Sequence, residues 1–281
     1  GARHDIEVDG RSQLAVKDLS GALFGTRGIG TNPEARTTFS IKGFDPVDQL
    51  TRYCRWWRTG HLSSTGRCFD IGTTTRAALA AFEETRDPYP GSTDPRAAGN
   101  GSLMRLAPVP MAFARDPQDA LAKAALSSRT THGAREAIDA CRYFAGLLIG
   151  AIEGRPKTEL LSPRFSPVLA LWSQASLTPK IAAVAAGSFT TKNPPAIRGT
   201  GYVVDCLEAA LWAFHRSTSF KEGALLAVNL GDDADTTGAV YGQLAGAYYG
   251  EQGIPEAWRT RLAHRELIES LADRLYTLSQ E

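Results

Sequence analysis

The chain has 281 residues, of which 43% are hydrophobic and 22% charged, and its formal net charge is +1. Such a composition is typical of a globular protein, and so small a charge gives no reason to expect nucleic acid or an acidic membrane surface as a partner. The sequence has no apolar run of about 18 residues and no signal-peptide pattern, so we expect no membrane span and a cytoplasmic protein. Four widely spaced cysteines without a C-x-x-C pair suit a reducing compartment.

Apolar residues recur at helical spacing in nearly every long segment, whereas the Val, Ile and Thr alternation of strands is nearly absent. We therefore expect an all-α fold, an orthogonal helix bundle that forms a single domain over residues 1–281. The predicted helical faces, in chain order, are Leu50, Tyr53, Cys54 and Trp57; then Ala134, Ala137, Ile138, Cys141, Ala145 and Leu148; then 202–214; then 240–249; and finally Leu267, Leu271, Leu275 and Leu278.

The connections between these helices are rich in glycine, proline and threonine, and each ends where a helix is predicted to start. In a helix bundle such loops can gather at one end, where free backbone N–H groups provide sites for anions. The predicted connections are 63–75, 87–110, 127–133, 188–202 and 231–238.

The most informative connection is acidic, with three carboxylates and two hydroxyls within residues 232–237. Asp233, Asp235 and Thr236 offer the oxygen ligands that Mg²⁺, Mn²⁺ or Ca²⁺ prefer, and carboxylates so close together repel one another unless a cation or proton neutralises them. The alternative is an acidic helix cap, which needs only one aspartate. An EF-hand is excluded because Leu244 stands where the loop requires a bidentate glutamate.

A second loop, 98–105, places Gly99, Asn100, Gly101 and Ser102 before an apolar run. Glycines let backbone amides approach a phosphate or diphosphate, although Gly-Asn-Gly is also ordinary turn chemistry. The loop lacks the Lys-Ser/Thr ending of a P-loop, so the sequence does not support that kind of nucleotide hydrolysis.

Two further residues stand out in loops before predicted helices. His132 falls near a helix start, where the helix dipole lowers an imidazole pKa, although a lone histidine there is more often a surface or capping residue. Asp70 lies in a loop of apolar and small residues, where a carboxylate is either a substitute N-cap or an activated group.

Taken together and in order, these segments resemble the ADP-ribosylglycohydrolase family, which includes the dinitrogenase reductase-activating glycohydrolases and the ADP-ribosyl-acceptor hydrolases. The resemblance implies an all-α orthogonal bundle with a binuclear Mg²⁺ or Mn²⁺ centre that hydrolyses the bond between ADP-ribose and a protein side chain, often arginine. The segments that carry it, within 43–250, are 43–46, 63–72, 99–105, 127–133, 201–205 and the acidic turn.

The resemblance also implies roles for individual residues. Asp233, Asp235 and Thr236 match the carboxyl-terminal metal motif of the family, and Asp70 matches an aspartate beside the metals and the scissile bond. The residues implied in substrate binding are Gly99, Asn100, Gly101, Ser102 and Met104 at the diphosphate, His132 at the ligand and Tyr202 near the nucleoside. The implied partners are ADP-ribose or an ADP-ribosylated protein.

The chain departs from the family pattern near its amino terminus, where a Thr-Asp-Asp-Thr motif normally supplies the other metal ligands. No such motif precedes Phe44 and Asp45, and roughly 20 to 30 residues are missing if a helix should lie there. Glu34 stands where the family has a mobile catalytic glutamate. Three hypotheses follow: a metal-dependent hydrolase, a catalytically impaired relative that binds ADP-ribose or an ADP-ribosylated protein, and a helical structural or partner-binding protein.

Overall fold

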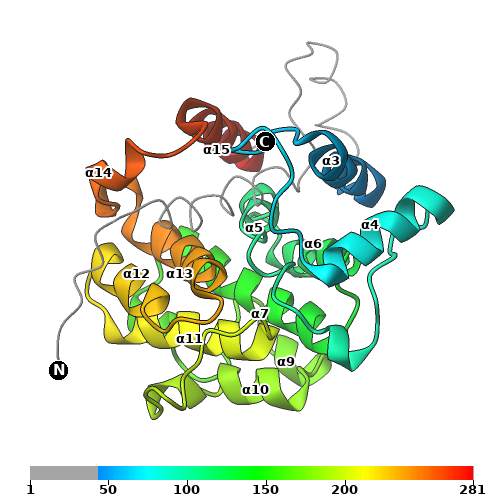
Figure 1. Cartoon of the computed structure of the whole chain (residues 1–281). Helices are drawn as coiled ribbons and strands as arrows, with labels where there is room; N and C mark the ends of the chain where they lie inside the picture. Colours follow the sequence, from blue (N-terminus) through cyan, green and yellow to red (C-terminus); the bar gives the residue numbers. More distant parts are fainter. Residues whose placement is uncertain (1–43, 281) are drawn as a thin grey trace.

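Two helices that are apolar around most of their circumference, α7 (Arg135–Ile152) and α11 (Val203–Arg216), form the centre of the fold. The computed structural model describes residues 44–280, and Figure 1 shows α7 and α11 in the middle of this part of the chain. Helix α13 (Ala234–Tyr249) packs against both of them, and α6 (Pro117–Arg129) packs against α7. Glu34, the implied catalytic glutamate, lies outside the described residues.

The remaining helices surround this centre, with α3 and α4 on one side and α12 and α13 on the other (Figure 1). They are α3 (Pro46–Thr59), α4 (Thr73–Thr85), α5 (Pro108–Ala112), α8 (Lys157–Leu160), α9 (Leu171–Gln174), α10 (Pro179–Ala185), α12 (Phe220–Val228), α14 (Glu256–Arg259) and α15 (Arg265–Gln280), with short 3-10 turns at η2 (Pro95–Ala97), η3 (Ser188–Thr190) and η4 (Glu251–Gly253).

The all-α prediction is confirmed for residues 44–280. This part of the chain contains no β-strand and only two isolated bridges, Ser92 with His132 and Gly99 with Tyr202. Both bridges join loops that the sequence singled out, so they hold the candidate site together. The expectation of one domain over 1–281 stays a prediction, because residues 1–43 fall outside the description.

The amino-terminal pair of helices has its own small core. Leu50 and Tyr53 of α3 pack with Leu79 and Phe82 of α4, and all four side chains are at most 9% exposed. Asp45 caps α3 by accepting hydrogen bonds from the N–H groups of residues 47 and 48. The predicted face of α3 is therefore correct, and its less buried members Cys54 and Trp57 lie at the edge of this cluster.

The loop boundaries differ from the prediction in four places. The predicted 63–75 and 231–238 connections both end inside helices, because α4 starts at Thr73 and α13 starts at Ala234. The predicted 127–133 connection begins inside α6, because Ser127 and Ser128 belong to its last turn, and the predicted 87–110 connection ends inside α5, which starts at Pro108. Proline has no N–H to lose at a helix start, which explains why a proline-rich stretch begins this helix. No helix found within 44–280 combines the length and apolar character needed to cross a bilayer.

Candidate functional site

Three loops that are far apart in sequence meet at Asn100, and backbone and side-chain hydrogen bonds join them. The Asn100 N–H donates to the carbonyl of Gly201 (3.1 Å), and its Nδ2 donates to the Asp233 carboxylate (2.7 Å) and the Thr200 carbonyl (3.3 Å). The Asp233 N–H in turn donates to the Gly199 carbonyl (2.8 Å). The glycine loop and the acidic turn, which the sequence singled out separately, are therefore parts of one site.

Asp233 occupies the N-cap position of α13, but its side chain does not cap the helix. Instead the carboxylate accepts hydrogen bonds from Thr236 Oγ1 (2.9 Å) and from Asn100. Asp235 is half-buried beside it, and burial together with the negative charge of Asp233 raises the pKa of Asp235. The capping interpretation therefore does not account for the turn, whereas a pair of close carboxylates suits a bound cation.

The donor set fits one hard divalent cation. Two carboxylates and the Thr236 hydroxyl supply oxygen ligands, and a carboxylate oxygen that accepts one hydrogen bond keeps a lone pair for a metal. Within residues 44–280 no third histidine, cysteine or acid joins them in a cluster. The remaining coordination positions would fall to water, to the substrate or to groups outside this part of the chain.

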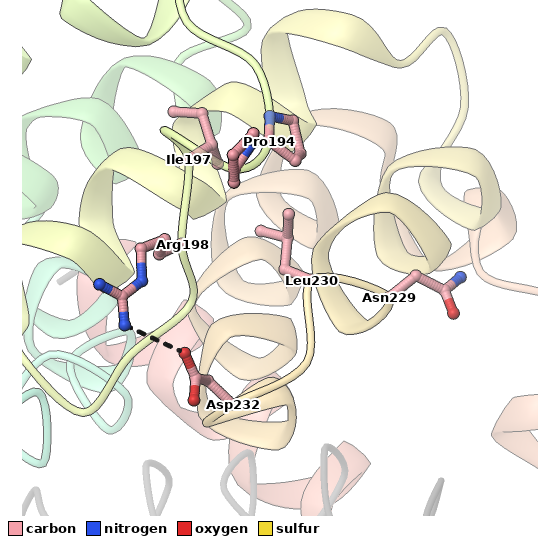
Figure 2. Close-up of a pocket in the computed structure, with 7 residues that line it drawn as sticks. Pro194, Ile197, Arg198, Asn229, Leu230 and Asp232 are labelled. Atoms are coloured by element: carbon pink, nitrogen blue, oxygen red, sulfur yellow. Dashed lines mark ion pairs between the residues drawn. The ribbon is translucent and has the colours of Figure 1, made fainter.

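The third acid of the turn, Asp232, has a different partner. Its carboxylate lies 3.7 Å from the guanidinium of Arg198, and both side chains are more than half exposed. The pair lines a cavity of about 300 Å³ (Figure 2), whose walls include Pro194, Ile197 and Leu230. Asp233 and Asp235 do not line this cavity, so the neighbouring residues Asp232 and Asp233 lie in different environments.

The glycines of the 99–102 loop make room for His132. A Cβ on Gly101 would lie 2.8 Å from His132 Cε1, and one on Gly99 would lie 3.3 Å from Nε2. The same Gly101 Cβ would lie 3.5 Å from Thr75 Oγ1, which places the start of α4 beside the loop. Met104 reaches the acidic turn, because Thr236 Oγ1 lies 3.9 Å from its sulfur.

His132 is 3% exposed, and its Nδ1 lies 2.8 Å from the hydroxyl of Thr131. Burial, and to a smaller degree the charge of Arg105, lowers the pKa of His132 to about 3. The sequence predicted a lowered pKa from a helix dipole, but the residue precedes α7 by two positions beyond its N-cap Ala134, and burial is the main cause. The imidazole is neutral at physiological pH.

Acid should therefore destabilise the protein through His132. In the unfolded chain His132 takes up a proton below its ordinary pKa of about 6.5, whereas in the folded chain it stays neutral until about pH 3. Between these values the free energy of unfolding should fall by on the order of 1.4 kcal/mol per pH unit from this residue. Urea unfolding from pH 7 to 4.5 should show a shallower decline for His132→Gln than for the wild type, and parallel declines would contradict the assignment.

Asp70 is exposed and adopts a left-handed backbone conformation (φ 49°) two residues before Gly72, the N-cap of α4. Its carboxylate makes no hydrogen bond to residues 44–280, and α4 has no side-chain cap, so the N-cap interpretation is wrong. The start of α4 lies beside the Gly101 loop at Thr75, so Asp70 lies on the segment that leads toward the site.

Tyr202 is the N-cap residue of α11, and its backbone forms the bridge to Gly99. Its hydroxyl donates to Glu136 and accepts from Lys180 Nζ (2.8 Å), whose ammonium also lies 5.0 Å from the ring centroid. A charged pair thus fixes the ring beside the 99–102 loop. No motif in the sequence points to Glu136 of α7 or Lys180 of α10.

Two other supporting residues escaped the sequence analysis. Gln243 of α13 is 4% exposed and binds the backbone of the 103–107 turn with three hydrogen bonds. Arg105 is 7% exposed and contacts Gly101 and Thr131. Gln243 could have been noticed as a polar residue in an apolar helical stretch. Arg105 could have been noticed as the charged residue three positions after Ser102 of the glycine loop.

The chain is similar to known proteins over most of its length. A family model described as ADP-ribosylglycohydrolase matches residues 16–281. A protein of Pseudomonas putida named ADP-ribosylarginine hydrolase Tri1 is 40% identical over 86% of this chain and 63% of its own length, and its namesake from Serratia proteamaculans is 38% identical over 81% and 60%. The chain therefore spans less than two thirds of the length of either relative.

A more distant relative is the ADP-ribosyl-[dinitrogen reductase] glycohydrolase of Rhodospirillum rubrum, which is 29% identical over 80% of this chain and 69% of its own length. A solved structure described as an ADP-ribosylglycohydrolase-related protein complex is 40% identical, covers 96% of this chain and 99% of its own, and superposes with a TM-score of 0.73. The chain therefore belongs to the ADP-ribosylglycohydrolase family.

Proposed function

We propose that this chain is a hydrolase that releases ADP-ribose from arginine side chains of modified proteins. The observation that carries the proposal is the hydrogen bond from Asn100 to Asp233, which places a glycine loop suited to a diphosphate directly beside a carboxylate pair suited to a cation. The arginine linkage is supported by the names of the Pseudomonas and Serratia relatives. The four free cysteines suit the cytoplasm that the sequence predicts.

In this proposal Asp233, Asp235 and Thr236 hold Mg²⁺ or Mn²⁺, which would supply Lewis-acid chemistry and orient ribose hydroxyls. Asn100 holds Asp233 in place, and the 99–102 loop with Met104 receives the diphosphate. Tyr202 borders the nucleoside, and neutral His132 offers a hydrogen bond from the wall of the loop.

Hydrolysis requires water to attack the anomeric carbon while the bond from this carbon to the guanidine nitrogen breaks. We assign the role of accepting the proton of the water to Asp70, with Glu34 as a second acid outside the described residues. The departing guanidine takes up one proton, which balances the one that Asp70 accepts from the water, so the net reaction consumes one water and leaves Asp70 unchanged. An exposed carboxylate on a loop that leads into the site is free to face the substrate.

The test is release of ADP-ribose from a protein modified on arginine, compared with a protein modified on serine. We expect release from arginine in Mg²⁺ or Mn²⁺, loss of release in excess chelator, and recovery when the cation is added back. No release from either protein at high enzyme and cation concentration would overturn the proposal.

A second candidate is a catalytically impaired relative that binds ADP-ribose or an ADP-ribosylated protein. It is favoured by the small donor set within residues 44–280, where two carboxylates and a hydroxyl are fewer ligands than a two-metal centre needs. ADP-ribose binding that is insensitive to chelator, together with no turnover, would favour this candidate. A chelator-sensitive rate of release would reject it.

A further inference from the structure

Arg105 is a buried cation for which the described chain provides no counter-ion. Its side chain follows the glycine loop and is 7% exposed, yet no carboxylate within residues 44–280 forms an ion pair with it. The buried carboxylates within residues 44–280 are paired, as Asp139 is with Arg142 (3.0 Å) and Glu208 with Lys192 (2.7 Å). Burial of an unpaired charge is costly, so this exception requires an explanation.

The contacts of Arg105 are with neutral groups that shape the site. Nη1 donates to the carbonyl of Gly101 (2.6 Å), Nη2 donates to Thr131 Oγ1 (2.6 Å), and the guanidinium lies 4.9 Å from the ring centroid of Tyr53. The buried Nε–H has no partner in the part of the chain that the structure describes. The charge is therefore held against the glycine loop and is not neutralised there.

Two backbone N–H groups of the glycine loop also lack a hydrogen-bond acceptor. The N–H of Gly99 bonds to the Ala97 carbonyl, and that of Asn100 bonds to Gly201, but the N–H groups of Gly101 and Ser102 donate to no atom of residues 44–280. Two adjacent free amides at the start of a turn favour an anion. The Gly101 carbonyl that accepts from the Arg105 guanidinium therefore lies next to these two N–H groups in the backbone.

We infer that Arg105 is the buried counter-charge of the diphosphate site that the proposed function places at the 99–102 loop, and that the bound diphosphate neutralises it. The guanidinium then attracts the ligand through the loop and also fixes the Gly101 carbonyl, so that both amides face the same side. Because Coulomb attraction in a buried site is screened less than at a surface, the charge strengthens diphosphate binding at ordinary salt concentrations.

Arg105 also positions His132 through Thr131. Since Thr131 Oγ1 accepts a hydrogen bond from Nη2, its own proton is available to His132 Nδ1 at 2.8 Å. This arrangement favours the imidazole tautomer with its proton on Nε2, the nitrogen nearest the glycine loop. The same cation thus orients a second donor toward the anion.

The inference rests on the proposed function for the source of the diphosphate, so the experiment uses two probes. Binding of inorganic pyrophosphate and of ADP-ribose is measured by calorimetry for the wild type, Arg105→Gln and Arg105→Lys. We expect Arg105→Gln to weaken the affinity for both ligands by roughly 10- to 50-fold. The affinities of Arg105→Lys should stay within about fivefold of those of the wild type. In the hydrolysis assay the KM of Arg105→Gln should rise more than its kcat falls.

Arg142→Gln is the matched control, because Arg142 is another mostly buried arginine beside an aromatic ring, 5.5 Å from that of Trp172, but it is paired with Asp139. It should lose stability without losing ligand affinity. If Arg105→Gln binds both probes as tightly as the wild type, or if the wild type binds neither, the inference is overturned. Wild-type binding of pyrophosphate without ADP-ribose would reject the proposed function alone.

Should Arg105→Gln fail to fold, the wild type still provides a test. The Nε–H resonance of Arg105, identified by its absence from Arg105→Lys, should shift when pyrophosphate saturates the protein. An unchanged resonance would contradict the inference.

Discussion

Asp233→Ala is expected to lower the rate of ADP-ribose release from arginine by about 10³-fold or more, since a lost Lewis acid removes several kcal/mol of transition-state stabilisation. Asp233 accepts hydrogen bonds from Asn100 (2.7 Å) and Thr236 (2.9 Å), so it joins the diphosphate loop to the proposed cation site. Steady-state release at several Mn²⁺ concentrations measures the effect, and calorimetric titration with Mn²⁺ should show weakened binding of the cation.

The chain offers a matched control in the adjacent residue. Asp232 carries the same charge on the same turn, but it is exposed and lies 3.7 Å from Arg198 beside the cavity. Asp232→Ala should leave the rate within about twofold of the wild type, as is usual for an exposed substitution. Equal losses for both variants would show that the turn acts through its net charge or its stability, and not through a specific ligand at 233.

The helical architecture could be predicted from the sequence because apolar spacing reports which face of a helix is covered. On α7 the predicted Ala137, Cys141, Ala145 and Leu148 are buried, but so is nearly every residue from 139 to 151. A helix in the centre of a bundle is covered on all sides, and periodicity cannot show this. Ile138, placed on the predicted face, is only half-buried.

The site could be predicted in parts but not in its connections. Functional residues that lie close together in the chain, such as the acids of the 232–237 turn, can be recognised from the sequence. The hydrogen bond from Asn100 to Asp233 joins residues 133 positions apart, and only the fold brings them together. The cause of the lowered pKa of His132 was missed for the same reason, because burial depends on packing and not on position along a helix.

The supporting residues were missed because their types have ordinary roles elsewhere. Glu136 and Lys180 read as solvent-facing charges of separate helices, and nothing local connects them to Tyr202. Arg105 reads as a surface arginine after a turn, yet it is 7% exposed. Charged residues are seldom buried without a reason, so the informative observation is structural.

Gln243→Met should be the most damaging substitution for stability among the residues near the site. The Gln243 side chain accepts a hydrogen bond from the Ala107 N–H (2.7 Å) and donates to the carbonyls of Leu103 (3.1 Å) and Met104 (2.9 Å). Methionine has a similar volume but makes none of these bonds, so buried backbone groups lose their partner. At 1 to 3 kcal/mol for each such group, we expect a loss of about 4 kcal/mol in the free energy of unfolding.

Urea unfolding measures this loss, with Gln118→Met as the control, because Gln118 is an exposed glutamine of α6 and the same substitution there should change stability by less than about 0.5 kcal/mol. The turn that Gln243 holds follows directly from Gly101 and Ser102 and contains Arg105. Folded Gln243→Met should therefore also bind pyrophosphate more weakly than the wild type. A loss below about 1 kcal/mol with unchanged affinity would mean that the turn keeps its shape without the glutamine, and that α13 supports the site through the acidic turn alone.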